Sequence, residues 1–147
     1  MKPQVVDVNI WLAILLHEHT HHKVARDWFE SVPTAGAGMC RVVQLSMMRL
    51  LGNPRVAGKF AMPALDAWNI LQSLIDDDER VVFLPEPAGM EGFLPLLLRY
   101  PRPTGQLIPD AYLCAFAMAA YSTLVTLDQG FRQFRDLDMV LLGLRAE

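Results

Sequence analysis

The sequence predicts an α/β protein, a three-layer α/β/α sandwich with a mainly parallel central sheet. Short β-rich runs alternate with longer helical stretches, which is typical of parallel strands joined by helices. The run 123–127, TLVTL, is apolar or β-branched throughout, as expected for a strand that helices cover on both faces. The chain has 147 residues, the length of one domain, so we expect a single domain over 1–147.

The N-terminal part is expected to begin with a strand at 4–6 that ends at Asp7. An apolar run then predicts a helix at 10–16. A second helix is predicted at 21–30, with Thr20 as its N-cap, because a threonine hydroxyl accepts hydrogen bonds from the first free amides of a helix.

The middle of the chain is divided by glycine and proline. The residues Gly52, Asn53 and Pro54 end one helix, and Pro63 begins another. The elements expected here are a turn-rich connection at 33–38, a strand or helix entry at 39–43, a helix at 44–51, a basic loop at 55–62, a helix at 63–74 and a strand at 81–84.

The C-terminal part holds the most apolar stretch. A helix is predicted to start with Pro109 and Asp110 in its first turn and to be buried on all sides. The other elements expected here are a helix at 89–99 broken at Pro95, a loop at 100–105, a strand at 123–127 and a final strand at 137–142.

Composition excludes several classes of protein. The apolar runs are too short to span a bilayer, and the N-terminus lacks the long apolar region of a signal peptide. Two cysteines form no disulfide framework, so we expect reduced thiols and a cytoplasmic protein. A net charge of −3 provides no overall basic field, so nucleic-acid binding requires a local patch.

Three aspartates stand at the ends of predicted strands or the start of a predicted helix: Asp7, Asp110 and Asp128. Each alone is explained by capping, but acids beyond the carboxyl ends of buried parallel strands lie where α/β proteins bind ligands. Clustered carboxylates repel one another, and a divalent cation removes that repulsion while activating water and polarising a phosphate. The three together therefore favour a metal-dependent phosphoryl-transfer site.

Three segments resemble the PIN domain, and more narrowly the VapC-type toxin ribonucleases of bacterial toxin–antitoxin pairs: DVNIWLAILLHEHTHH, QLSMMRLLGNP and PDAYLCAFAMAAYSTLVTLDQGF. The resemblance implies a PIN-like domain that binds Mg²⁺ or Mn²⁺ and hydrolyses RNA, with a cognate antitoxin as partner. By matching of motifs, it assigns metal binding and catalysis to Asp7, Asp110 and Asp128. It assigns supporting roles to Asn9 and Thr126.

The sequence departs from this family at the start of the third helix, where a glutamate is usual. Gln44 is the nearest match, and its amide oxygen accepts a hydrogen bond without supplying charge. Basic residues in the same segment are expected to contact RNA phosphates. They are Arg41, Arg49, Arg55 and Lys59.

Three alternatives remain open. The missing glutamate favours a metal- and RNA-binding PIN-like module with weak or no nuclease activity. The second alternative is an aspartyl-phosphate phosphatase. That class requires a second aspartate two residues after its nucleophile, and the Asn9 found there argues against it. An apolar surplus favours a pure interaction protein as the third alternative. For the ribonuclease itself, the same surplus predicts a homodimer and an apolar groove near the active site that binds the antitoxin. The residues in that surplus are Trp11, Ile14, Leu15, Leu16, Met39, Met47 and Met48.

Overall fold

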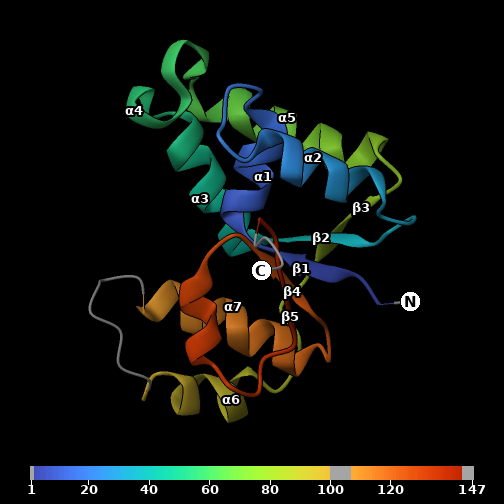
Figure 1. Ribbon diagram of the computed structural model, residues 1–147, viewed down its shortest axis with the longest axis vertical. Helices are drawn as coiled ribbons and strands as arrows, with labels where there is room; N and C mark the ends of the chain where they lie inside the picture. The colour runs from blue at the N-terminus through green and yellow to red at the C-terminus, as the bar shows by residue number, and fades with distance from the viewer. Residues whose placement is uncertain (1, 100–106, 144–147) are drawn as a thin grey trace.

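The computed structural model of the protein describes residues 2–99 and 107–143. Its centre is a five-stranded sheet in the order β3-β2-β1-β4-β5, with every neighbouring pair parallel. Helices α1, α2, α3 and α5 lie over one face, and α6 and α7 lie over the other (Figure 1). The predicted three-layer α/β/α sandwich is confirmed, and its sheet is wholly parallel.

The N-terminal elements follow the prediction with shifted boundaries. Helix α2 starts after His21, which makes no side-chain cap hydrogen bond, so the expected Thr20 cap is wrong. Strand β2 begins inside the segment predicted as a turn. Gly38 belongs to this strand because only a residue without a side chain leaves room there for the side chain of Leu84. The bounds are β1 Gln4–Val6, α1 Val8–Leu15, α2 His22–Glu30, β2 Ala37–Cys40 and α3 Arg41–Leu51.

The predicted basic loop at 55–62 is instead partly helical. Asn53 Oδ1 accepts a hydrogen bond from Arg55 N at 3.0 Å, and Pro54 occupies the first helical position. These are the usual start signals of a helix, and here they build one short turn. The bounds are α4 Pro54–Ala57, a 3₁₀ turn η1 Gly58–Phe60, α5 Ala64–Asp77 and β3 Val81–Leu84.

The C-terminal elements form the second helical layer and the other half of the sheet. Helix α6 continues through Pro95 rather than breaking there, because Pro95 is exposed and the carbonyl deprived of a partner can bind water. The predicted loop at 100–105 lies outside the described residues. The bounds are α6 Met90–Leu97, α7 Leu107–Ala119, β4 Leu124–Thr126, a 3₁₀ turn η2 Gln129–Gln133 and β5 Met139–Leu141.

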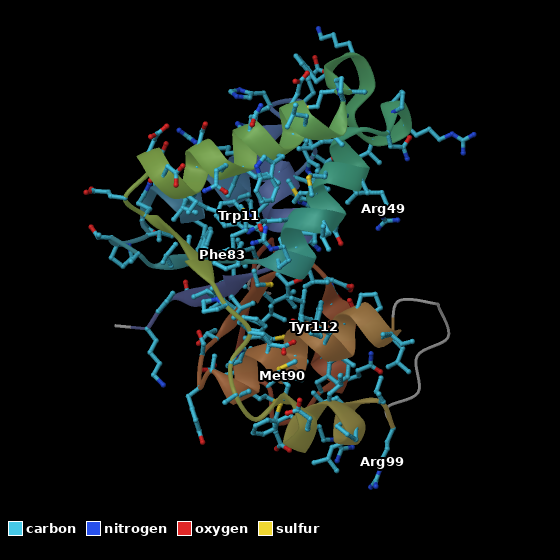
Figure 2. All side chains as sticks on the ribbon, turned by 180° about the vertical axis from the view of Figure 1, so that it is seen from behind. Trp11, Arg49, Phe83, Met90, Arg99 and Tyr112 are labelled. Carbon is cyan, nitrogen blue, oxygen red and sulfur yellow. The ribbon has the colours of Figure 1, made fainter. Side chains whose placement is uncertain are left out.

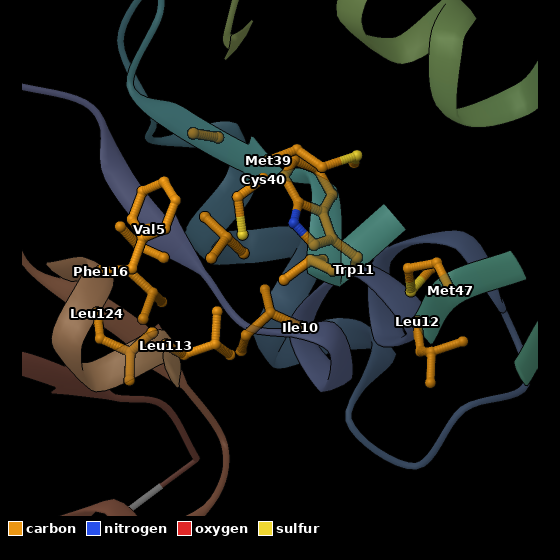
Figure 3. Packing of buried hydrophobic residues seen from close by; sticks show 14 of the residues in the cluster. Val5, Ile10, Trp11, Leu12, Met39, Cys40, Met47, Leu113, Phe116 and Leu124 are labelled. Atoms are coloured by element: carbon orange, nitrogen blue, oxygen red, sulfur yellow. The ribbon is translucent and has the colours of Figure 1, made fainter. Parts of the chain in front are cut away.

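The core fills both sides of the sheet. Trp11, Met39 and Met47 are completely buried members of one hydrophobic cluster (Figure 3). Most of the apolar surplus expected to form a partner surface is therefore core, and that interpretation was wrong for Trp11, Met39 and Met47. None of the described helices is long and apolar enough to cross a membrane.

Candidate active site

The strand order places two of the predicted acids side by side. The chain runs outward from β1 through β2 to β3, then returns to place β4 against the other edge of β1. Ligands of open α/β sheets bind outside the carboxyl ends of the strands where the order reverses in this way. Asp7 directly follows β1 and Asp128 follows β4 by two residues, so both lie at this point.

Hydrogen bonds from two described residues fix the orientation of the Asp7 carboxylate. Its Oδ1 accepts from Val8 N at 2.7 Å, which makes it the N-cap of α1. Its Oδ2 accepts from the Thr126 hydroxyl, also at 2.7 Å. Asp7 is only 7% exposed, so its carboxylate is oriented before any ligand arrives.

Asp128 is positioned by the turn after β4. Its Oδ1 accepts from Gly130 N at 2.7 Å, and its own N–H donates to Thr126 Oγ1 at 3.0 Å. Asn9 Oδ1 accepts from Leu127 N at 3.3 Å and ties the start of α1 to the same turn. Thr126 and Asn9 thus join the two strand ends that carry Asp7 and Asp128.

Asp110 comes from the opposite helical layer. It lies in the first turn of α7 and is 8% exposed. A carboxylate is favoured in the first turn because the backbone amides there are unpaired donors. Cys114 follows one helical turn later, and burial, reinforced by the negative charge of Asp110, raises the pKa of its thiol to about 12. Cys114 therefore stays a neutral thiol and supplies no thiolate ligand at neutral pH.

All three aspartates line one cavity of about 460 Å³ between the two helical layers. Asn9 lies on the same lining, and α3 contributes Ser46 and Arg49. The remaining wall is aliphatic and consists of Val8, Leu12, Val42, Val43, Leu50, Pro109 and Leu113. The structure therefore brings together the acids that the sequence singled out.

Gln44 does not lie on this lining. It is 1% exposed, and its Oε1 has no hydrogen-bond partner among the described residues. Because each residue of an α-helix advances by about 100°, Gln44 and Ser46 point about 160° apart around α3. The polar side chains that α3 presents to the cavity are those of Ser46 and Arg49, and the sequence analysis did not single out Ser46.

The other predicted basic residues also lie elsewhere. The guanidinium of Arg41 lies over the rings of Trp68 and Phe83, at 5.3 and 5.0 Å from their centroids. Lys59 pairs with Glu18 at 3.8 Å. Arg55 lines a separate pocket of about 230 Å³. Of the four, Arg49 alone lines the cavity of the aspartates.

The donor set fits a hard divalent cation. Carboxylate oxygens suit both Mg²⁺ and Mn²⁺, and Mg²⁺ commonly takes one or two carboxylates and keeps several waters. Within residues 2–99 and 107–143, no three acid, histidine or cysteine side chains already form a group that could hold an ion. The three aspartates share a cavity with the right chemistry, but they do not form a ready-made three-ligand cluster.

The fold and cavity define an α/β protein with an acidic site at the reversal of strand order, and comparisons with known proteins agree. Residues 5–137 match the family model described as PIN domain. Ribonuclease VapC41 of Mycobacterium tuberculosis is 36% identical over 141 residues, covering 93% of this chain and 97% of that protein. Ribonuclease VapC25 of the same species is 29% identical, covering 88% and 92%. The chain therefore belongs to the PIN-domain family, among the VapC ribonucleases.

Solved structures agree on the fold. The Mycobacterium tuberculosis toxin VapC20, described as cleaving the sarcin-ricin loop, superimposes with a TM-score of 0.65 at 20% identity, covering 89% of this chain and 94% of that one. VapBC2 of Rickettsia felis, crystallised with a DNA fragment from its promoter, gives 0.64 at 13% identity, covering 94% and 97%. Sequence identities this low support the shared architecture alone.

Proposed function

We propose that the protein is a Mg²⁺- or Mn²⁺-dependent endoribonuclease that hydrolyses RNA phosphodiester bonds, the toxin of a bacterial type II toxin–antitoxin system. The observation that carries this proposal is the convergence of Asp7, Asp110 and Asp128 on one cavity at the carboxyl ends of β1 and β4. Family membership supports the same activity, since the relatives are named ribonucleases.

In this proposal the three aspartates would hold one or two divalent ions. A bound ion would lower the pKa of a coordinated water and would neutralise part of the phosphate charge. The chain's own residues supply position: Thr126 and Val8 N orient the Asp7 carboxylate, and Gly130 N orients that of Asp128. The aliphatic part of the wall lowers the local polarity and so strengthens electrostatic interactions inside the cavity.

RNA cleavage by the purified protein tests the proposal. Cleavage with Mn²⁺ or Mg²⁺ is expected to stop in EDTA, and Asp7→Asn, Asp110→Asn and Asp128→Asn are each expected to lower it at least about a hundredfold, or roughly 3 kcal/mol of barrier. Asp77→Asn is the matched control, because Asp77 is exposed on α5 outside the cavity. Full activity of the three site variants would refute the assignment.

A second candidate is a metal- and RNA-binding PIN-like module with weak or no nuclease activity. The specific observation in its favour is that α3 offers the cavity Ser46 and Arg49 but no fourth acid. This candidate predicts RNA binding and Mn²⁺ binding by a protein that leaves the RNA intact. The cleavage assay above therefore separates the two candidates directly.

A cognate antitoxin is the proposed protein partner. Structural neighbours include the VapBC-1 complex of nontypeable Haemophilus influenzae and FitAB bound to a DNA fragment. On this chain an apolar pocket of about 180 Å³ lies between the ends of α1 and α3 and the middle of α5. Its lining residues include Leu15, Leu16, Leu51, Phe60 and Met62. A pocket of this kind suits apolar side chains of a partner segment.

A homodimer is the proposed assembly, on a surface different from the one the sequence suggested. Leu45 of α3 is 55% exposed and Leu65 of α5 is 68% exposed, and these two helices pack against each other. Exposed leucines on adjoining helices favour burial against a second copy. An RNA substrate, together with free buried Cys40 and Cys114, supports a cytoplasmic location as part of this proposal.

A further inference from the structure

The negative charge of the cavity that the three aspartates line repels the phosphates of RNA, and a bound divalent ion compensates that charge only in part. Three carboxylates face a substrate whose backbone is itself a chain of anionic phosphates, and like charges in a partly enclosed site repel. RNA must therefore meet positive charge on the chain as well. Among the described lining residues, Arg49 alone carries a positive charge.

Arg49 lies on the face of α3 that lines the cavity. Val42, Ser46, Arg49 and Leu50 are spaced four, three and one residues apart, so they form one stripe along the helix, and all four line the cavity. A cation in the last turn of a helix is favoured by the helix dipole, but the dipole does not select a face. Its position on this stripe places Arg49 on the wall of the cavity that the acids also line.

Four described basic residues near the first helical layer are held by acids, whereas Arg49, like Arg41 and Arg55, is not. Lys23, Arg26, Lys59 and Arg80 each pair with an acid within 4.0 Å. Arg49 is exposed and forms no ion pair with any described residue. Figure 2 shows its side chain extending from the end of α3, well away from Phe83, over which Arg41 lies. Its donors remain available to a ligand.

We infer that Arg49 binds a phosphate of the RNA strand opposite the three aspartates, an inference that rests on the proposed ribonuclease function. A guanidinium presents a planar fork of N–H donors that matches two phosphate oxygens and stays charged at every physiological pH. The Ser46 hydroxyl, nearly one turn earlier on the same stripe, is a second donor at the phosphate. Arg49 is thus a substrate-binding residue, and the aspartates remain the metal-binding wall.

The residues that line the cavity also indicate that Arg49 contacts the RNA backbone and not a nucleobase. Readers of single-stranded bases stack them on aromatic rings, and no aromatic side chain is among the described residues that line this cavity. The aliphatic wall gives a base no specific hydrogen bonds. The contact is therefore with the backbone and independent of RNA sequence, so base selection must come from surfaces outside the cavity.

The test measures RNA binding rather than cleavage. A fluorescein-labelled single-stranded RNA is titrated in EDTA, which prevents hydrolysis, with wild type, Arg49→Gln, Arg49→Lys and the control Arg55→Gln at several salt concentrations. Arg55 is also exposed and basic but lines a different pocket. We expect Arg49→Gln to weaken binding about tenfold and to reduce the slope of log K against log salt by about 0.7, the value for one phosphate contact on a single strand.

The variants distinguish a phosphate contact from a merely structural role. Arg49→Lys keeps the charge, so it is expected to restore the salt slope while recovering only part of the affinity. Arg55→Gln is expected to match wild type. An unchanged salt slope in Arg49→Gln, or an equal loss in Arg55→Gln, would overturn the inference.

The two proposals also fail separately. If wild type cleaves RNA and Arg49→Gln cleaves it with the same KM and salt slope, the nuclease stands and the Arg49 contact is refuted. If wild type binds RNA with the Arg49-dependent slope but never cleaves it with Mn²⁺, the contact stands and the nuclease is refuted.

Discussion

Thr126 donates a hydrogen bond from Oγ1 to Asp7 Oδ2 at 2.7 Å, joining the carboxyl ends of β4 and β1 through a buried pair. The same oxygen accepts from Asp128 N at 3.0 Å. One hydroxyl therefore contacts the first and last of the three aspartates, and it fixes their relative position across the junction of two strands. Thr126 is completely buried, so no water replaces its hydroxyl.

Replacing Thr126 with valine is expected to destabilise the protein by about 1.5–3 kcal/mol, the range for a hydrogen bond to a charged group. Thr123→Val is the matched control. Thr123 also donates to an aspartate, Asp138 Oδ2 at 3.0 Å, but that contact is exposed. We expect its loss to cost less than about 0.5 kcal/mol. Urea unfolding of both variants measures the difference, and equal losses would show that the Asp7–Thr126 bond has no special role.

The position of Ser46 changes what to expect from added charge. A glutamate at Ser46 would bring a fourth carboxylate to the cavity, so Ser46→Glu should tighten Mn²⁺ binding by about 1–3 kcal/mol at an effective dielectric near 20. Gln44→Glu would instead bury an ion away from the cavity, and we expect it to destabilise the fold without tightening Mn²⁺. Isothermal titration with Mn²⁺ decides between the two, and tighter binding by Gln44→Glu alone would contradict the structure.

The sequence was enough to select Asp7 and Asp128 as candidate site residues, but it was not enough to predict which face of α3 lines the cavity. Asp7 and Asp128 follow strongly β-forming runs, and acids in such places stand out in a sequence. The residues from 43 to 51 are mostly apolar on more than one side, so periodicity did not reveal which stripe faces the sheet edge. That choice depends on how α3 packs on α1 and α5, which tertiary structure decides.

Strand β2 shows a second limit of sequence reasoning. Gly36 and Gly38 predicted a turn, since glycine usually marks one. In the structure Gly38 is a residue of strand β2, and its lack of a side chain leaves room for the neighbouring strands β1 and β3 to pack against it. A Cβ at Gly38 would lie 2.7 Å from Gln4 O of β1. The need for a glycine arises from neighbours far away in the chain, and a local pattern does not contain them.

The pH dependence of stability can be tested at Asp78. Its hydrogen bonds to the Arg80 guanidinium hold the pKa of its carboxyl below the ordinary value of 3.8. The folded state thus binds this proton less readily than the unfolded state, so the stabilisation is present above that ordinary value and is lost as pH falls through the folded pKa. We expect Asp78→Asn to cost about 0.5 kcal/mol at pH 7 and less near pH 2. Thermal unfolding at both values checks this, with exposed Asp76→Asn as control. A constant difference would contradict it.

The last prediction concerns the surface through which the proposed homodimer forms. Leu45 and Leu65 expose more than half of their side chains on two packed helices, whereas the larger apolar side chains Trp11, Met39 and Met47 are in the core. A charge placed in an apolar interface must be desolvated, which costs several kcal/mol and dissociates a modest dimer.

Sedimentation velocity at micromolar concentration is expected to show a dimer for wild type and a monomer for Leu45→Glu and Leu65→Glu. Leu96→Glu is the control, since Leu96 is 53% exposed but lies on α6, in the opposite helical layer. It is expected to stay dimeric. Circular dichroism of each variant checks that the fold is retained. A wild-type monomer at high micromolar concentration, or a dimer that only Leu96→Glu disrupts, would rule out the α3–α5 surface as the interface.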